Sequence, residues 1–294
     1  MTTLTNETAI DEVIELAILA DPYEKKGDIS VTGLLRPPQM AYLESQHEDE
    51  IKEDVSEGLW KLLGSAVHVV LERGAKKVKT WRVEQRLMIR THGWDISGKY
   101  DLWRPLEDGG ELIDFKVTSA WSFLLEPTGV KPEWEAQLNL YAYMLRQSGT
   151  PVTKLTTLAI LRDWMKSKAK HDRDYPQVGF KSVDVPLWSE EKQLDFLENK
   201  VTLHQAARID SRFAPCTDEE RWAKPDKYAA KKKGRKTATK LFGDKFEAQQ
   251  WVVEQTDARD FVLEHRPGTQ TRCEDYCAAM PWCDQAKELG VGHE

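Results

Sequence analysis

Three segments with the pattern of β-strands lie between two helical segments in the middle of the chain, and this order limits the possible folds more than any other feature. The expected strands cover residues 81–90, 94–103 and 111–117. Asp108-Gly109-Gly110, before the last strand, has the composition of a tight turn. Short connections predict an antiparallel meander, and the flanking helices predict a mixed α/β fold with a central sheet between helices.

The flanking segments have the apolar spacing of helices. Residues 54–77 carry a stripe of Leu, Ala and Val that is interrupted by Gly64 and His68, and residues 131–147 form the second helix. Further elements are expected beyond these two: a short helix at 10–19, strands at 154–166 and 177–185, and helices at 189–208 and near 247–254.

Composition divides the chain into three regions. Residues 1–54 are expected to form an entry segment that packs on the core, in which Ser30 or a neighbouring Thr caps a short helix running to Leu43. Residues 55–210 are expected to form the main domain. Residues 211–294 are short of apolar side chains and carry a basic stretch and four cysteines, so we expect this tail to need a staple in order to fold.

The overall composition excludes several classes of protein. A chain of 294 residues with 40% apolar composition can bury a sizeable core. It has no run of about eighteen apolar residues that would predict a membrane span, and its first residues lack the pattern of a signal peptide, so we expect a cytoplasmic protein. The net charge of −7 argues against a protein that coats nucleic acid.

Asp101, Asp114 and Lys116 are the main candidates for chemistry. Asp114 and Lys116 alternate along the third strand, so their side chains share one face, and the preceding turn brings Asp101 near them. Two converging carboxylates suit a hard divalent cation such as Mg²⁺. A lysine beside that ion can orient or deprotonate an attacking water and offset the negative charge of a phosphorane-like transition state.

An isolated Asp-x-Lys pattern is more often an ordinary ion pair on an exposed strand. Here the neighbours Leu112, Ile113, Phe115 and Val117 are apolar, so unpaired charges on this strand would be costly without a metal or a partner.

Four further polar residues accompany this pattern: His68, Glu84, Gln137 and Tyr141. Gln137 and Tyr141 are four residues apart on the following helix and therefore share a face. A lone histidine in an apolar stripe is more often a packed core residue than a ligand.

Taken in this order, these residues resemble a known family. The order His68, Glu84, Gly98-x-x-Asp101, Asp114-Phe-Lys116 and Gln137-x-x-x-Tyr141 resembles the motifs of RecB-like PD-(D/E)XK nucleases, including the CRISPR-adaptation and phage recombination members. The resemblance covers roughly residues 30–285, and it implies a restriction-endonuclease-like core.

The resemblance also implies a role for each residue. Asp101 and Asp114 would bind Mg²⁺ or Mn²⁺, with His68 and the carbonyl of Phe115 as further ligands. Lys116 would be catalytic, Gln137 and Tyr141 would position the lysine, the water or the DNA, and Glu84 would complete the catalytic set.

The four cysteines suggest a second metal centre. In a reducing compartment, Cys216 and the cluster Cys273, Cys277 and Cys283 suit either a 4Fe-4S cluster or structural Zn²⁺, and four free thiols are the third alternative. Relatives in the same nuclease branch build an iron–sulfur cluster from one distant cysteine and a C-terminal triplet. Here the lone cysteine follows the core, and the triplet opens with three intervening residues in place of two.

A basic stretch lies between Lys224 and Lys245, with nine Lys or Arg against two Asp. Such a run is usually a solvated face, but beside a phosphodiesterase site it can contact the DNA backbone. Trp222, Tyr228 and Phe242 interleave with it and suit either stacking on unpaired bases or local packing.

The expected function is metal-dependent hydrolysis of DNA with free ends or single strands, in recombination or repair in a bacterial or phage-infected cell. The sequence has no G-x-x-x-x-G-K-[ST] loop, so a helicase or recombination partner would have to supply any motor. Two alternatives remain open: a catalytically silent DNA-binding or scaffold protein with this fold, and a nuclease directed at RNA.

Overall fold

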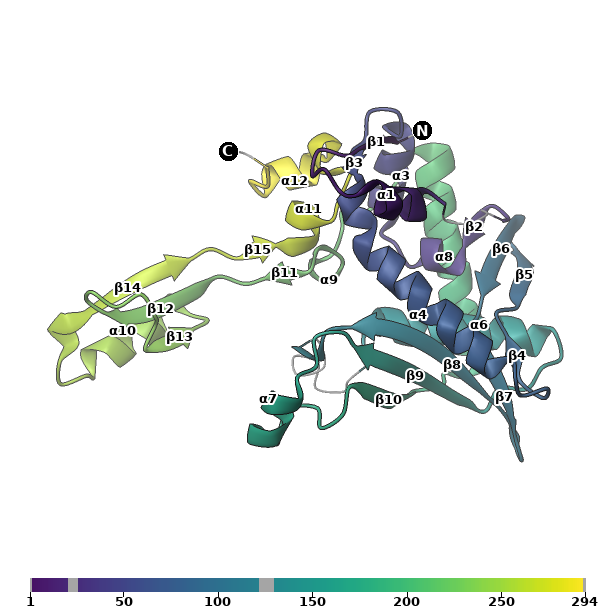
Figure 1. Ribbon diagram of the computed structural model, residues 1–294. Helices are drawn as coiled ribbons and strands as arrows, with labels where there is room; N and C mark the ends of the chain where they lie inside the picture. Colours follow the sequence, from purple (N-terminus) through teal and green to yellow (C-terminus); the bar gives the residue numbers. More distant parts are fainter. Residues whose placement is uncertain (1, 21–25, 122–129, 293–294) are drawn as a thin grey trace. The chain divides into compact units, whose positions relative to one another are not determined.

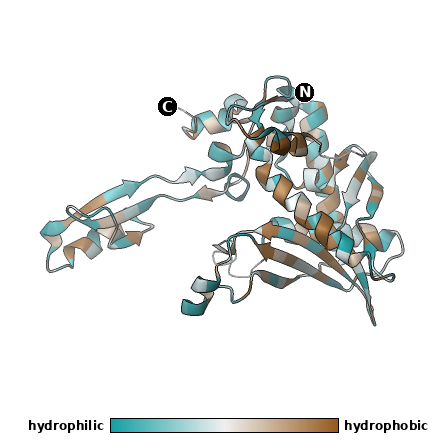
Figure 2. Cartoon of the chain, in the orientation of Figure 1, coloured by the Kyte–Doolittle hydropathy of each residue, from teal (hydrophilic) through white to brown (hydrophobic). Residues whose placement is uncertain are grey.

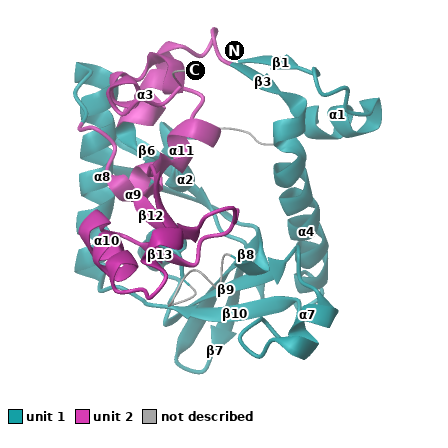
Figure 3. Ribbon diagram, turned by 90° about the vertical axis from the view of Figure 1, so that its left-hand side faces the viewer, with its two compact units in different colours: residues 1–38, 52–213 teal, residues 39–51, 214–294 magenta. Residues whose placement is uncertain are grey.

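The computed structural model describes residues 2–20, 26–121 and 130–292. These residues form two compact units, which are coloured separately in Figure 3. Unit 1 consists of Met1–Pro38 and Lys52–Phe213, and unit 2 consists of Gln39–Ile51 and Ala214–Glu294. None of the helices in the described part of the chain is long and apolar enough to cross a membrane.

A five-stranded mixed sheet is the centre of unit 1 (Figure 1). Its order is β10-β9-β8-β7-β4, with β8 parallel to β9 and the other neighbours antiparallel. The strands are β4 (Arg82–Val83), β7 (Leu102–Leu106), β8 (Gly109–Thr118), β9 (Lys154–Leu161) and β10 (Phe180–Val185). The other sheets of unit 1 contain β2 (Ile29–Ser30), β5 (Arg86–Thr91) and β6 (Trp94–Lys99), and β1 (Thr3–Thr5) and β3 (Lys52–Asp54).

Helices α4 (Leu59–Ala75) and α6 (Pro132–Gln147) pack on opposite faces of the central sheet. The other helical elements of unit 1 are α1 (Glu12–Leu19), α2 (Val31–Leu34), the 3₁₀ turn η1 (Val55–Gly58), α7 (Lys166–His171) and α8 (Glu190–Asp210). Ser189 caps α8, as its side chain accepts a hydrogen bond from the backbone of Lys192. The mixed α/β fold with a central sheet flanked by helices is thereby confirmed.

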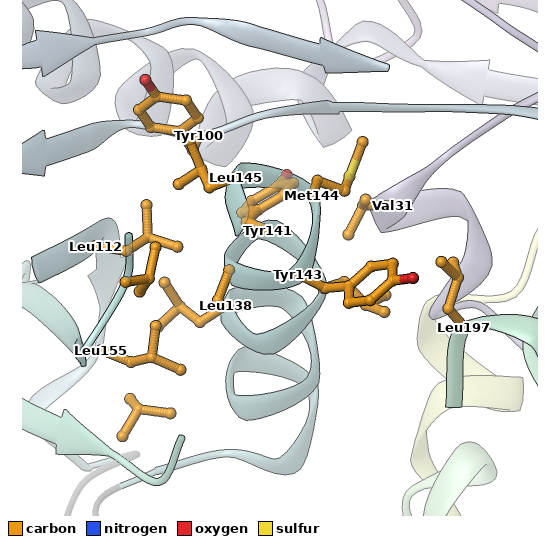
Figure 4. Close-up of a cluster of buried hydrophobic side chains, with 14 of the residues drawn as sticks. Val31, Tyr100, Leu112, Leu138, Tyr141, Tyr143, Met144, Leu145, Leu155 and Leu197 are labelled. Atoms are coloured by element: carbon orange, nitrogen blue, oxygen red, sulfur yellow. The ribbon is translucent and has the colours of Figure 1, made fainter. Parts of the chain in front are cut away.

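The alternation of side chains along β8 separates two apolar clusters. Leu112 belongs to the larger cluster on the α6 side, which Figure 4 shows with Leu138 and Leu155 around it. Ile113 and Phe115 point to the opposite side, where they pack with Ala75 of α4. Because β8 is covered on both faces, its carboxylates, Glu111 and Asp114, are taken out of water.

The predicted strands 81–90 and 94–103 form one hairpin, but the prediction of unbroken strands was wrong. The register is constant along the hairpin, with Arg82 opposite Trp103 and Arg86 opposite Lys99. Between these pairs the hairpin bends, and its far half leaves the central sheet so that β6 pairs with β2. The bend falls at Glu84, which has a left-handed φ of 54° that regular strands do not accommodate.

The predicted helix from Ser30 to Leu43 is also interrupted. Ser30 does cap α2, because its side chain accepts a hydrogen bond from the backbone of Gly33. Consecutive prolines follow at 37 and 38, and α3 (Pro38–Gln46) begins only there. Proline lacks the backbone donor and restricts the residue before it, so one continuous helix cannot form.

Unit 2 is built from short elements around a long hairpin. Its strands are β11 (Ala223–Lys224), β12 (Lys227–Lys232), β13 (Lys240–Phe242), β14 (Phe261–Arg266) and β15 (Thr269–Gln270), with β11 paired to β15 and β12 between β13 and β14. Its helices, besides α3, are α9 (Asp218–Arg221), α10 (Lys245–Val253), α11 (Thr271–Asp275) and α12 (Asp284–Glu288), with 3₁₀ turns η2 (Ala258–Asp260) and η3 (Met280–Trp282).

Truncation of the core should show how much α6 contributes to stability. Leu138 is fully buried between α6 and the sheet, so Leu138→Ala should lower the free energy of unfolding by about 2–5 kcal/mol. Leu106→Ala, at a residue that is 38% exposed, is the matched control and should change it by about 0.5 kcal/mol or less. Urea denaturation measures both variants, and equal losses would contradict this assignment of the core.

Candidate active site

The bend in the hairpin opens one edge of β8 at Phe115. The last antiparallel pair of β7 and β8 joins Leu102 to Ile113, so Phe115 has no strand partner on that edge. Its N–H donates to Oδ2 of Asp101 at 2.6 Å, and its carbonyl oxygen lies 3.0 Å from Nε2 of His68. A carboxylate and an imidazole thus occupy the positions where a neighbouring strand would otherwise pair.

Three polar side chains gather at this edge. His68, Glu84 and Asp101 each contribute one potential ligand atom, and these three atoms lie within 4.8 Å of one another. Nδ1 of His68 is 3.3 Å from Asp101 and 3.9 Å from Glu84. Glu84 also pairs with Lys99, a residue that sequence reasoning missed although it shares a strand face with Asp101.

Asp114 lies beside this group, at the position opposite Asp101 in the continued register. Nζ of Lys116 is 2.8 Å from Oδ2 of Asp114 and donates to Oε1 of Gln137 at 2.9 Å. The amide of Gln137 in turn donates to the hydroxyl of Tyr141 at 3.3 Å. Tyr141 therefore fixes which end of the Gln137 amide faces the lysine.

Gly98 makes room for Tyr141. A Cβ atom at this position would lie 2.7 Å from Cε1 of Tyr141, which is closer than carbon atoms approach in proteins. The glycine in the Gly98-x-x-Asp101 pattern is therefore required by the packing of the tyrosine ring against β6.

The pKa values of His68 and Asp114 are both raised, for different reasons. Hydrogen bonds to Asp101 and then to Glu84 raise the pKa of His68 to about 10. Complete burial raises the pKa of Asp114, and Lys116 only partly opposes this. A carboxylate that burial disfavours in this way gains from any cation placed beside it.

The donor set fits a hard divalent cation. Oδ2 of Asp114 is buried and accepts no hydrogen bond of acceptable geometry from the described residues, although Lys116 is nearby. Carboxylate and carbonyl oxygens are ligands suited to Mg²⁺ or Mn²⁺. The site residues predicted from the sequence in unit 1 are thus brought together, from α4, the bend after β4, β8, α6 and the link between β6 and β7.

The sequence of residues 39–284 matches the family model described as the PD-(D/E)XK nuclease superfamily. This match covers most of the chain. The chain belongs to the PD-(D/E)XK nuclease superfamily.

Nucleases of this superfamily hydrolyse phosphodiester bonds, so the chain is assigned to the hydrolases. Two solved structures are similar to it at low identity. The protein SSO0001 has 18% identity and a TM-score of 0.45, over 68% of this chain and 89% of that protein. A protein from Eubacterium rectale, provisionally described as an exonuclease, has 9% identity and a TM-score of 0.33, over 67% of this chain and 73% of that protein. No curated protein matches the sequence significantly.

The cysteines lie within unit 2, and two glutamines contact Cys216 and Cys283. Oε1 of Gln39 and Oε1 of Gln285 both accept the N–H of Cys216, at 3.0 Å and 2.8 Å, and the amide of Gln39 donates to Sγ of Cys283 at 3.4 Å. Burial, then Glu220 and the other three thiols, raise the pKa of Cys216 to about 12. All four cysteines are free and half-buried.

The aromatic residues of the basic stretch pack locally. Phe242 lies 5.7 Å from Trp251, Tyr228 stacks on His265 at 5.1 Å, and Trp222 meets Tyr276 edge-on at 5.3 Å. Two of the lysines are also neutralised, Lys231 by Glu264 and Lys232 by Asp257. Of the two interpretations left open by the sequence, local packing is the one that the structure supports.

Metal binding at the nuclease site can be separated from catalysis by two substitutions. Saturating Mn²⁺ should raise the melting temperature by about 5 °C, because a ligand at about 100 times its dissociation constant contributes about 2.7 kcal/mol. Asp114→Asn should abolish this shift. Lys116→Ala should keep it, since the ammonium group is not a ligand, and an equal loss in both variants would contradict the separation.

Proposed function

We propose that the chain is a divalent-metal-dependent deoxyribonuclease, and more specifically an exonuclease that acts in recombination or repair. The observation that carries the proposal is the convergence of three groups at the open edge of β8: the carboxylates of Asp101 and Asp114, and His68 beside the Phe115 carbonyl. A silent DNA-binding protein has no need for this group together with a positioned lysine.

The metal ligands are proposed to be His68, Asp101, Asp114 and the carbonyl oxygen of Phe115, with His68 binding as the neutral imidazole after it gives up its proton. Glu84 was assigned to the catalytic set by resemblance, and its place within 4.8 Å of His68 and Asp101 supports a role next to the ion. When bound, Mg²⁺ or Mn²⁺ would supply a Lewis acid that polarises the scissile phosphate and favours deprotonation of water.

Lys116 is the proposed catalytic residue. Its ammonium group is held between Asp114 and Gln137, so it points to the place where the scissile phosphate would meet the metal ligands. There it orients the attacking water and offsets the charge that builds on the phosphate oxygens. Water adds to phosphorus, the bond from phosphorus to the leaving oxygen breaks, and that oxygen takes up a proton.

The setting of this reaction is also proposed. DNA with single strands or free ends is the proposed substrate, and the cytoplasm of a bacterial or phage-infected cell is the proposed location. A helicase or another recombination protein is the proposed partner.

For the four cysteines we propose a 4Fe-4S cluster that pins unit 2. Gln39 links Cys216 to Cys283, and the charges of the other three thiols contribute to the raised pKa of Cys216, which supports a shared centre. Structural Zn²⁺, bound by the same four cysteines, is the alternative. Neither centre takes part in the cleavage step.

Cleavage of end-labelled DNA tests the proposed activity. Wild-type protein with Mg²⁺ or Mn²⁺ should shorten labelled single-stranded or duplex DNA progressively from an end. Lys116→Ala should slow cleavage at least about 100-fold, because a positioned lysine contributes to the transition state. Salt-sensitive DNA binding without cleavage by either protein would favour the silent alternative, and cleavage of labelled RNA alone would favour the RNA-directed one.

Elemental analysis of anaerobically purified protein tests the cysteine centre. Wild-type protein should carry iron and acid-labile sulfide in equal amounts and absorb visible light. Cys277→Ser should lose this iron and lower the melting temperature, whereas Asp114→Asn, in unit 1, should retain it. One zinc ion per chain and no sulfide would replace the iron–sulfur proposal with the zinc alternative.

A further inference from the structure

Two exposed tryptophans at the end of the central sheet in unit 1 each lie against a basic side chain. The indole of Trp60, in the first turn of α4, is 63% exposed, and the guanidinium of Arg162 lies 4.1 Å from its ring centroid. Trp121, shortly after β8, is 56% exposed, and the ammonium group of Lys168 lies 5.5 Å from its ring. Each ring therefore meets a cation and still offers more than half of its surface to a ligand.

This end of the sheet adjoins the active site. Thr118 pairs with Leu161 at the ends of β8 and β9, and the next backbone N–H, that of Arg162, donates to the carbonyl of Thr118 at 2.9 Å. Lys116 lies only two residues before Thr118. Trp60 precedes His68 by eight residues on the same helix, which corresponds to about 12 Å along α4.

The charge in this region differs from that of the whole chain. Residues 162–174 contain five Lys or Arg and three Asp, although the chain as a whole has a net charge of −7. None of these five basic side chains forms an ion pair with a carboxylate in the part of the chain that the structure describes. Figure 2 shows α7, which carries three of the lysines, as a hydrophilic segment.

Another tryptophan with a cation in the same unit has a different environment. Arg208 of α8 lies 5.6 Å from the ring of Trp94, but that ring is half-buried and packs against the main core cluster. The pair of Arg208 and Trp94 is therefore structural, whereas Trp60 and Trp121 contribute little to any core.

An exposed indole beside a free cation is suited to a nucleotide whose base is unpaired. The base stacks on the ring, and the cation neutralises the adjoining phosphate. In a duplex the base faces are already stacked on their neighbours, so a single strand makes these contacts at lower cost.

We infer that Trp60 and Arg162, with Trp121 and Lys168 beside them, form a subsite for single-stranded DNA next to the metal and lysine site. This inference rests on the proposed nuclease function. It adds that the DNA substrate is a single strand, which runs along the ends of β8 and β9.

Binding in the absence of divalent cations tests the subsite without cleavage. The probes are fluorescently labelled oligothymidylate, an abasic strand of the same length and a duplex, and fluorescence anisotropy gives the dissociation constants of the full-length protein. The variants are Trp60→Leu, Trp60→Phe, Arg162→Gln and, as a control of equal charge change, Arg208→Gln. Circular dichroism and melting temperature confirm that each variant is folded.

Trp60→Leu should weaken binding of oligothymidylate about fivefold or more and leave the abasic strand unaffected, since only a base can stack. Trp60→Phe should recover most of the loss. Arg162→Gln should weaken binding of both strands and reduce the slope of log affinity against log salt by about 0.7. Arg208→Gln should change neither.

Wild-type affinity for oligothymidylate in both Trp60→Leu and Arg162→Gln would overturn the subsite, as would a loss confined to duplex DNA. Cleavage by the wild-type protein in Mg²⁺ or Mn²⁺ is measured separately. A protein that binds as expected but never cuts would overturn the nuclease proposal and leave the subsite in place.

Discussion

The divergence of one hairpin from β8 is the feature on which the site depends. Strand β7 pairs with β8 from Leu106 back to Leu102, but the residues before Leu102 turn away from β8. The N–H and carbonyl of Phe115 therefore need other partners. Asp101 supplies the acceptor and His68 faces the carbonyl. A strand that continued in register would pair with both backbone groups and close the site. The bend at Glu84, with its strained φ, therefore keeps this edge of β8 open.

The core on the α6 side holds Lys116, the proposed catalytic lysine, in place. Ala136 and Leu138 are buried on either side of Gln137 along the helix, and Tyr141 is buried one turn later, so the amide that accepts from Lys116 comes from a packed element and not from a loop. The buried Asn139 adds to this rigidity, because its side chain accepts the N–H of Trp188 at 2.8 Å and donates to the carbonyl of Pro186 at 2.9 Å. The position of the lysine is therefore set by the same packing that stabilises the fold.

The sequence was informative where a pattern is local and less so where it is not. Alternation along residues 111–117 correctly placed Asp114 and Lys116 on one face, and helical spacing placed Gln137 beside Tyr141. The bend at Glu84 could not be predicted, since a left-handed glutamate has no compositional signal and its strain is offset by tertiary contacts. Arg162 and Trp60 were missed for a related reason: 102 positions separate them in the sequence, and only the packing of α4 across the sheet brings them together.

The composition of unit 2 explains why a staple is proposed there. The chain leaves unit 1 after Pro38, returns at Lys52 and leaves again after Phe213, so unit 2 is assembled from two stretches that are far apart in sequence. Gln39, through Cys216, and the stacking of His47 on Trp282 at 4.4 Å join these stretches, and the loop that they close contains most of the chain, so its closure costs entropy. All four proposed ligands come from the second stretch, and Gln39 of the first stretch is hydrogen-bonded to Cys216 and Cys283, so a bound cluster would fix the residues to which the first stretch is tied. Its binding energy would act as folding energy for a unit whose apolar side chains are too few to supply it alone.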